Sequence, residues 1–220
     1  MARHGDGSLD LQRMRFHERS QVLRAYCAPH VHNVDFYELT IRDTYAIVRF
    51  AINNGDSETF CVKNSTGKHA ERIVIEKLEA VLTERRTSTP ITELRVEIYL
   101  NYSPCNQGCC KALIKFKVDQ KQKKVKVDMK VIFANLYNVN RPRCITNGCA
   151  HYQSHPVDPD VDIQNRTGLK DLHNANIRLR TFTPDDWNFV ANALSVAKRD
   201  VEDGRVRDDL DMILSSQEGQ

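Results

Sequence analysis

The spacing of apolar residues between positions 45 and 133 changes repeatedly from that of a strand to that of a helix. The first two β-rich segments flank Asn53-Asn54-Gly55, a turn signal that favours a hairpin. Strands that alternate with helices predict an α/β fold whose sheet is mainly parallel, with the antiparallel hairpin at one edge. The expected order is β-β-α-β-α-β, over residues 45–52, 58–62, 69 to before 90, 94–100, 109–116 and 125–133.

The rest of the chain is expected to complete one domain. A length of 220 residues suffices for one sizeable core and is short for two. Thr183 as N-cap and Pro184 at the first helical position indicate where one helix begins. The domain is predicted to span residues 1–214, with a disordered tail at 215–220. Its further elements are a helix at 9–23, a loop from 138 to about 166, a short helix at 168–175, a strand at 177–182 and a helix from 183.

Composition narrows the function classes only slightly. Lys and Arg exceed Asp and Glu by 32 − 29 = 3, a mild basicity that permits nucleic-acid binding without arguing for it. The sequence has no apolar run of signal-peptide or membrane-spanning length. We therefore expect a cytoplasmic or nuclear protein that is not secreted and has no membrane partner.

The cysteines and one histidine predict a metal site. The chain has seven cysteines, an odd number, and intracellular proteins usually keep thiols for metal or catalysis. His69-Ala70-Glu71 begins one predicted helix, and Cys105 with Cys109 or Cys110 begins the next. Each motif follows an extended segment, so the two helix starts lie side by side at one edge of a parallel sheet. One imidazole and two thiolates, with a fourth position open for water, form a catalytic rather than a structural zinc site.

Glu71 is the candidate proton carrier at that site. Residues i and i+2 do not share a helix face, so we infer that His69 lies at the helix edge and Glu71 in the first turn. The helix dipoles and the cation keep the thiolates ionised and make a bound water acidic enough to give hydroxide near neutral pH. A carboxylate beside that water, not bound to zinc, can take its proton and deliver it to the substrate.

At this point the chain resembles the AID/APOBEC cytidine deaminases, whose signature is His-x-Glu with Pro-Cys-x-x-Cys. The resemblance implies a cytidine-deaminase-like three-layer fold, with a central five-stranded mixed sheet and about six helices. It also implies zinc-dependent hydrolytic deamination of cytosine to uracil in single-stranded DNA, with RNA as the alternative, with zinc-bound hydroxide attacking C4 and Glu71 carrying the protons. It runs from about Thr44 to Val190 and includes residues 103–105, 134–137, 168–173 and 187–190 in family order.

The spacing of the cysteines departs from the family pattern. The family has two residues between its cysteines, whereas Cys105 is separated from Cys109 by three residues and from Cys110 by four. Taking Cys109 as the ligand puts Leu113 and Phe116 where the family helix has core residues, and four residues still span about one helical turn. We expect Cys109 to be the third ligand, with Cys110 as the alternative.

The resemblance also implies substrate-binding residues on loops that border an open trench, in which a single-stranded polynucleotide lies with its target base flipped inward. Thr44 and Asn64 would contact the sugar and phosphate of the target nucleotide. Ser103 would contact the cytosine, and Tyr137 would stack on its ring. Tyr102 replaces the family's usual Trp, which keeps an aromatic wall of a different shape.

Basic residues on the same predicted loops could neutralise phosphates, and ordinary solvated charge is the alternative. A denser lysine run should lie at the opposite end of its helix from the active site, where a solvated loop is favoured. The trench candidates are Arg24, His30, His32, Lys63 and Lys68, and the distant lysines are Lys121, Lys123 and Lys124.

The loop after Tyr137 holds four further potential ligands, at spacings that a second, structural zinc could use. A closed metal site would explain how so long a loop stays ordered beside a trench. Plain thiols and surface imidazoles are the alternative, and a single zinc per chain that Cys144→Ser leaves unchanged would exclude the second metal. The four residues are Cys144, Cys149, His151 and His155.

Related chemistries and a non-catalytic role stay open as alternatives. Free-nucleoside deaminases look shorter and usually lack the helix predicted here at residues 168–175. Adenosine deaminases of transfer RNA typically carry an acidic residue before Pro-Cys, where this chain has Ser103. A catalytically silent, zinc-containing nucleic-acid-binding protein would have no use for Glu71. The sequence does not indicate DNA or RNA, the flanking base, the oligomeric state, or a role in innate immunity, immune diversification or editing.

Overall fold

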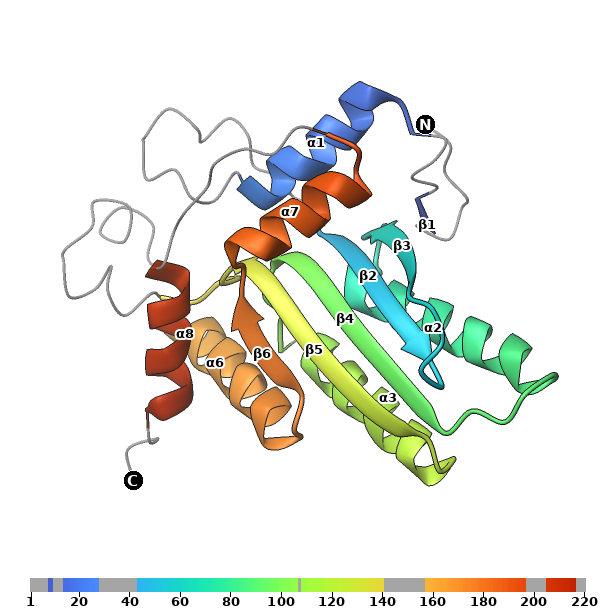
Figure 1. Ribbon diagram of the computed structural model, residues 1–220. Coiled ribbons are helices and arrows are strands. Elements are labelled where there is room, and N and C mark those ends of the chain that lie inside the picture. The colour runs from blue at the N-terminus through green and yellow to red at the C-terminus, as the bar shows by residue number, and fades with distance from the viewer. Residues whose placement is uncertain are drawn as a thin grey trace.

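A mixed β-sheet lies at the centre of the computed structural model, which describes residues 8–9, 14–27, 43–106, 108–140, 157–196 and 205–216 (Figure 1). Its strand order is β1-β3-β2-β4-β5-β6. Five of the strands are those expected from the sequence, and the sixth is a two-residue strand that pairs with β3 at the edge. The strands are β1 (Ser8–Leu9), β2 (Tyr45–Ile52), β3 (Glu58–Lys63), β4 (Glu93–Tyr102), β5 (Lys126–Asn135) and β6 (Arg178–Thr181).

The strand directions follow from the turn between β2 and β3. Asn53 and Asn54 both have left-handed backbone angles, with φ of 49° and 59°, which asparagine tolerates and which a tight hairpin turn requires. β2 pairs antiparallel with both β3 and β4, whereas β4, β5 and β6 are parallel to one another. The predicted mixed sheet with an antiparallel hairpin toward one edge is therefore confirmed.

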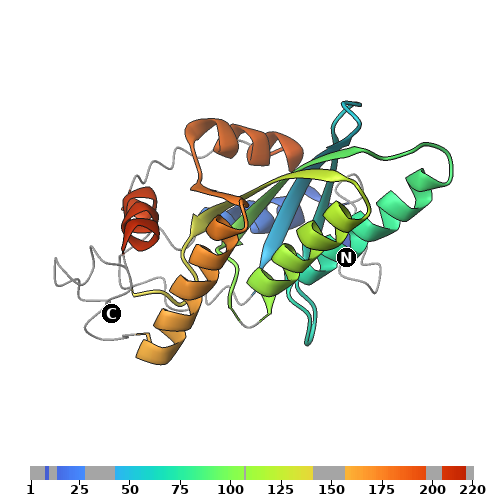
Figure 2. The same cartoon turned by 90° about the horizontal axis from the view of Figure 1, so that it is seen from below.

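Six helices are described, and they form the outer two layers around the sheet. Figures 1 and 2 show α2, α3 and α6 against one face, α1 and α7 against the other, and α8 beside α6 and β6. Among the described residues, no helix has the length and apolar character needed to span a bilayer. The helices are α1 (Phe16–Cys27), α2 (Ala70–Arg86), α3 (Cys109–Gln122), α6 (Pro159–Asn174), α7 (Pro184–Ala193) and α8 (Arg205–Ser215).

Each face of the sheet has its own hydrophobic core, because successive side chains of a strand point to opposite faces. Ile98 of β4 is fully buried in the larger core, against α2, α3 and α6. Its neighbour Tyr99 lies in the smaller core with Tyr26 of α1 and Trp187 of α7. The alternating apolar residues predicted on one face of β5 all belong to the larger core or pack against it: Val125, Val127, Met129, Val131 and Phe133.

The expected bounds of α6 and α1 are wrong, and one further helix was not expected. α6 begins at Pro159 and not at residue 168, because Asp158 caps it by accepting hydrogen bonds from the N–H groups of Asp160 and Val161. α1 spans residues 16–27 and not 9–23, and Leu9 belongs to β1. α8 was not expected; among its described side chains, Leu210 and Ile213 belong to the larger core and Leu214 packs against it.

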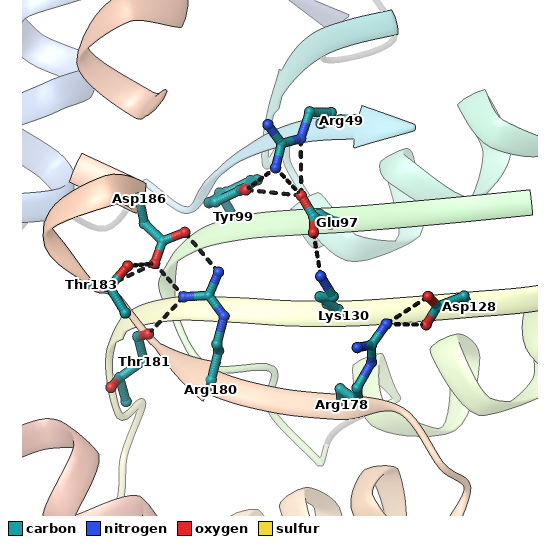
Figure 3. Close-up of polar contacts among 10 residues, drawn as sticks. All are labelled: Arg49, Glu97, Tyr99, Asp128, Lys130, Arg178, Arg180, Thr181, Thr183 and Asp186. Atoms are coloured by element: carbon teal, nitrogen blue, oxygen red, sulfur yellow. Dashed lines mark hydrogen bonds and ion pairs between the residues drawn. The ribbon is translucent and has the colours of Figure 1, made fainter. Parts of the chain in front are cut away.

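A ladder of charged side chains crosses the sheet on the face that carries α1 and α7 (Figure 3). Glu97 of β4 accepts hydrogen bonds from Arg49 Nε of β2 at 2.9 Å and from Lys130 Nζ of β5 at 2.7 Å. The Tyr99 hydroxyl donates to the same carboxylate at 3.0 Å. Burial alone would raise the pKa of Glu97, but the hydrogen bonds from Lys130 and Arg49 outweigh it and lower the pKa to about 2.

A second group of polar contacts fastens α7 to the same sheet (Figure 3). Thr183 is the N-cap, as predicted, and its N–H donates to the Asp186 carboxylate at 2.7 Å. Arg180 of β6 donates to the other oxygen of that carboxylate at 2.8 Å. These contacts lower the pKa of Asp186 against the opposing effect of burial, so the buried carboxylate stays ionised where the helix begins.

Candidate metal centre

The sheet brings the two helix starts together. β3 runs antiparallel to β2, and β2 runs antiparallel to β4, so β3 and β4 end at the same edge of the sheet. His69 follows β3 and is the N-cap of α2, with an extended backbone (φ −72°, ψ 152°). Cys105 lies in the loop after β4, and Cys109 is the first residue of α3.

Three side chains meet at this edge with spacings suited to a metal ion. The Nδ1 atom of His69 lies 3.3 Å from Cys105 Sγ and 3.2 Å from Cys109 Sγ, and the two sulfurs are 3.6 Å apart. Ligands around a tetrahedral zinc ion, with bonds of about 2.0–2.3 Å, are separated by about 3.6–3.8 Å. The distances between the three side chains are equal to or slightly shorter than those in a zinc site. A small outward shift of the side chains would make room for the ion, so this group could hold a metal ion such as zinc.

Cys110 points away from this group. Its sulfur is buried and lies 3.6 Å from the backbone carbonyl oxygen of Pro104. The sulfur also faces α6, where a Cβ added to Gly168 would lie 2.9 Å from it. Burial raises the pKa of the Cys110 thiol far above its usual range, as expected for an unreactive packed cysteine. The structure therefore brings Cys109, and not Cys110, together with His69 and Cys105.

Glu71 lies beside the three ligands without being one of them. Its side chain is buried, and the Cys109 thiol donates to Glu71 Oε2 at a distance of 3.4 Å. Burial raises the pKa of Glu71 to about 7, and a cation at the three ligands would lower it. A buried carboxylate in this position is within reach of a water at the open ligand position and can take and return its proton.

The donor set fits a divalent cation for electrostatic reasons as well. The neighbouring Cys105 thiol, burial and Glu71 together raise the pKa of Cys109 far above that of a free thiol. Two thiols and a carboxylate in one buried contact cannot all ionise unless a positive charge joins them. A thiolate-bound zinc ion supplies that charge, and imidazole with thiolate ligands is typical of zinc sites.

Three of the residues predicted to bind substrate form one group near the centre. The Ser103 Oγ atom accepts a hydrogen bond from the backbone N–H of Tyr137 at 2.9 Å, which leaves its hydroxyl proton free to donate. The rings of Tyr102 and Tyr137 meet edge to face, with centroids 5.9 Å apart. Burial raises the pKa of Tyr137, and the groups of Cys105, Cys109 and Glu71 add to the rise.

The other two predicted substrate-binding residues pair with each other at the start of β2 and the end of β3. The Thr44 N–H donates to Asn64 Oδ1, and the Asn64 N–H donates to the Thr44 carbonyl, both at 2.9 Å. These contacts fix the backbone of the two loop residues next to the hairpin.

The predicted basic residues have mixed outcomes. Lys63 is ion-paired with Asp43 at 2.5 Å, and Lys68 is ion-paired with Glu76, which weakens the case for either as a free phosphate ligand. The distant lysines lie at or just beyond the C-terminal end of α3, as expected: Lys121, Lys123 and Lys124. Several predicted residues cannot be compared, because they or their side chains lie outside the described part of the chain. They are the trench candidates Arg24, His30 and His32, and the four predicted ligands of a second metal, Cys144, Cys149, His151 and His155.

Sequence reasoning missed Asn165 of α6, which contacts two site loops. Its Oδ1 atom accepts from the backbone N–H of Asn106, and its Nδ2 atom donates to the carbonyls of Tyr137 and Asn138. The expected loop extended to about residue 166, so Asn165 was not placed on a helix. Asp158 before Pro159 is the N-cap signal that would have extended α6 and put residue 165 on its buried face.

Comparison with models of known protein families gave no match, and comparison with curated proteins gave none either. The class of site therefore rests on geometry. A mixed sheet that places an imidazole, two thiols and a neighbouring carboxylate at one edge is consistent with a cytidine-deaminase-like fold and its active site. The same group suggests a zinc hydrolase.

Proposed function

We propose that this protein is a zinc-dependent deaminase that converts cytosine to uracil in single-stranded polynucleotide. The observation that carries the proposal is the buried Glu71 carboxylate, in contact with Cys109 but outside the His69, Cys105 and Cys109 group. A purely structural zinc site has four protein ligands and needs no such carboxylate. A hydrolytic site needs both an open ligand position and a proton carrier.

Glu71 performs the proton transfers of the proposed reaction. A zinc ion bound by the three ligands would act as a Lewis acid and make water available as a nucleophile near neutral pH. Glu71 takes a proton from the attacking water and delivers it to N3 of the ring as the C4–O bond forms. Glu71 then takes the proton of the new C4 hydroxyl and gives it to the C4 amino group, so that the C4 carbonyl forms, the C4–N bond breaks, and ammonia leaves with uracil as the product. A pKa that burial raises suits a group that must accept and return protons.

The aromatic pair supports a nucleobase as the substrate. Tyr137 is 36% exposed, so part of its ring is open to a base, and Tyr102 packs against its edge. Stacking on an exposed aromatic ring is a common way to hold an unpaired base. Ser103, whose hydroxyl proton is available, would donate to the cytosine, and Thr44 with Asn64 would contact the sugar and phosphate. These roles are inferred from the resemblance to the AID/APOBEC family.

The test is deamination of an oligonucleotide that contains one cytosine, detected by uracil excision and strand cleavage. We expect product with single-stranded DNA or RNA and none with duplex DNA. Glu71→Ala should fold, bind zinc and give no product. Glu84→Ala is the matched control, because Glu84 is exposed near the other end of the same helix.

Other outcomes identify the alternatives. Product from free cytidine but not from the oligonucleotide would indicate a nucleoside deaminase, and product only from adenosine in RNA would indicate an adenosine deaminase. Zinc and oligonucleotide binding without turnover of any substrate would indicate a catalytically silent binding protein. Normal turnover by Glu71→Ala would refute the proton-transfer role.

A further inference from the structure

Asn165 joins two segments that border the candidate metal centre. Its side chain is buried, with 3% exposure. The Oδ1 atom accepts from the N–H of Asn106, the residue after Cys105, at 3.0 Å. The Nδ2 atom donates to the carbonyl oxygens of Tyr137 at 3.2 Å and Asn138 at 3.0 Å. One amide group thus connects the loop after β4 with the segment after β5.

The same two segments also touch each other on the other side of Cys105. Ser103, two residues before Cys105, accepts from the N–H of Tyr137, and Tyr102 packs against the Tyr137 ring. Asn106, one residue after Cys105, is held through Asn165. The backbone around this ligand is therefore fixed on both sides by contacts that lead to Tyr137.

The helix that carries Asn165 lies very close to the ligand loop. A Cβ on Gly168, one turn further along α6, would lie 2.9 Å from Cys110 Sγ and 3.2 Å from Cβ of Asn106. Residues 165 and 168 lie on the same face of the helix. Because the α6 backbone meets the loop directly, the helix is a rigid support, and the Asn165 amide sets the position of the loop on it.

The geometry points to Asn165 as a positioning residue that fixes the separation between the metal ligand Cys105 and the base-stacking Tyr137. This inference rests on the proposed function, since Tyr137 matters only if a base stacks on it. Within the part of the chain that the structure describes, the Asn165 side chain makes its hydrogen bonds to backbone groups alone, so it acts through the backbone of the two segments. Groups that orient a metal site from outside typically change its affinity or activity about 10–100-fold when removed, and displacements of about 1 Å have similar effects.

Asn165→Asp and Asn165→Ala test the inference. Aspartate keeps the acceptor for the Asn106 N–H but places an oxygen against the two carbonyls, so it breaks the contact with Tyr137 and its neighbour. Alanine removes all three hydrogen bonds. The matched control is Asn140→Ala, because Asn140 is a buried asparagine of the segment after β5 whose side chain bonds both backbone groups of Val157, so that its removal leaves the hydrogen bonds of Asn165 in place.

Three measurements are compared: thermal melting, the absorption spectrum of the cobalt-substituted protein, and steady-state kinetics (kcat and KM) with a single-cytosine oligonucleotide. We expect all three variants to melt at lower temperature. The Asn165 variants should also shift the cobalt bands and lower kcat about 10–100-fold, whereas Asn140→Ala should keep the wild-type spectrum and kcat. If Asn165→Ala does not fold, Asn165→Asp provides the test.

The positioning role is overturned if folded Asn165 variants keep the spectrum and kcat of Asn140→Ala. Failure of the proposed function has a different result. In that case the wild-type protein binds cobalt but deaminates nothing, and the spectrum alone decides the role of Asn165. A shifted spectrum in the Asn165 variants, but not in Asn140→Ala, supports it, and an unshifted spectrum refutes it.

Discussion

Cys109 and Cys110 are adjacent in sequence but differ in environment because an α-helix turns by about 100° per residue. The Cys109 sulfur faces His69 and Cys105, whereas the Cys110 sulfur faces the carbonyl of Pro104. The sequence favoured Cys109 from the register of the core residues after it, and the side-chain positions agree with that choice.

The difference between the two cysteines is testable by metal analysis. Cys109→Ser should contain about one zinc per chain less than the wild-type protein, because it removes one of three ligands. Cys110→Ser should keep the wild-type zinc content and lose only some stability, since the smaller hydroxyl fills the buried position of the sulfur less well. Zinc measured by atomic emission in both purified proteins decides the matter. The reverse pattern would assign the third ligand to Cys110.

At the scale of elements, Glu97 connects β2, β4 and β5 through charged hydrogen bonds, and its pKa predicts how stability depends on pH. A free glutamate has a pKa of about 4.3, whereas that of folded Glu97 is about 2. The stabilisation is therefore complete above about pH 4.5 and is lost as the pH falls toward 2. Because the ladder is partly open to solvent, we expect about 1–2 kcal/mol.

Urea unfolding of Glu97→Gln and wild-type protein between pH 7 and pH 2.5 measures this contribution. The wild-type protein should have the larger unfolding free energy at pH 7, and its difference from Glu97→Gln should become smaller as the pH falls below about 4.5. Glu84→Gln, at an exposed position on α2, is the control and should show no such trend. A gap that is constant over the whole range would contradict the cross-strand role of Glu97.

Gly168 determines how closely α6 packs against the loop of the metal centre. Alanine in a helix is normally about 1 kcal/mol more stable than glycine, but here its Cβ would meet Cys110 Sγ at 2.9 Å. Overpacking of this kind costs about 1–3 kcal/mol, so we expect Gly168→Ala to be destabilising. In a Cys110→Ala background the nearest atom is removed, and the same substitution should cost less. Thermal unfolding of the wild type, the two single variants and the double variant measures the coupling between Gly168 and Cys110. Additive changes in stability would mean that contact with the Cys110 sulfur does not cause the cost of Gly168→Ala.

At the scale of the whole molecule, local patterns predicted most of the fold. β2 has the expected limits, and α2, β4, α3 and β5 begin within a few residues of their predicted positions, because apolar periodicity and turn residues act locally. The metal group could also be predicted, since residues that follow successive strands meet at one sheet edge. The start of α6 depended on a cap at Asp158 that a Pro-rich and Cys-rich loop obscured.

The contacts of Asn165 could not be predicted, because they join α6 to two loops from different strands. Such contacts depend on how far α6 is displaced along β5 and β6, and no sequence periodicity specifies that displacement. The ion pairs of Lys63 and Lys68 were missed for the same reason, since their partners approach from the segment before β2 and from α2. Sequence thus indicated which residues form the centre, and the three-dimensional packing determines what supports them.

X-ray absorption at the zinc edge tests the central claim most directly, on Cys144→Ser protein so that the predicted second site does not contribute. The account predicts two sulfur neighbours at about 2.3 Å, one imidazole nitrogen at about 2.0–2.1 Å and one further light atom from solvent. Four protein ligands around the zinc, or protein that folds and binds no zinc at all, would contradict it.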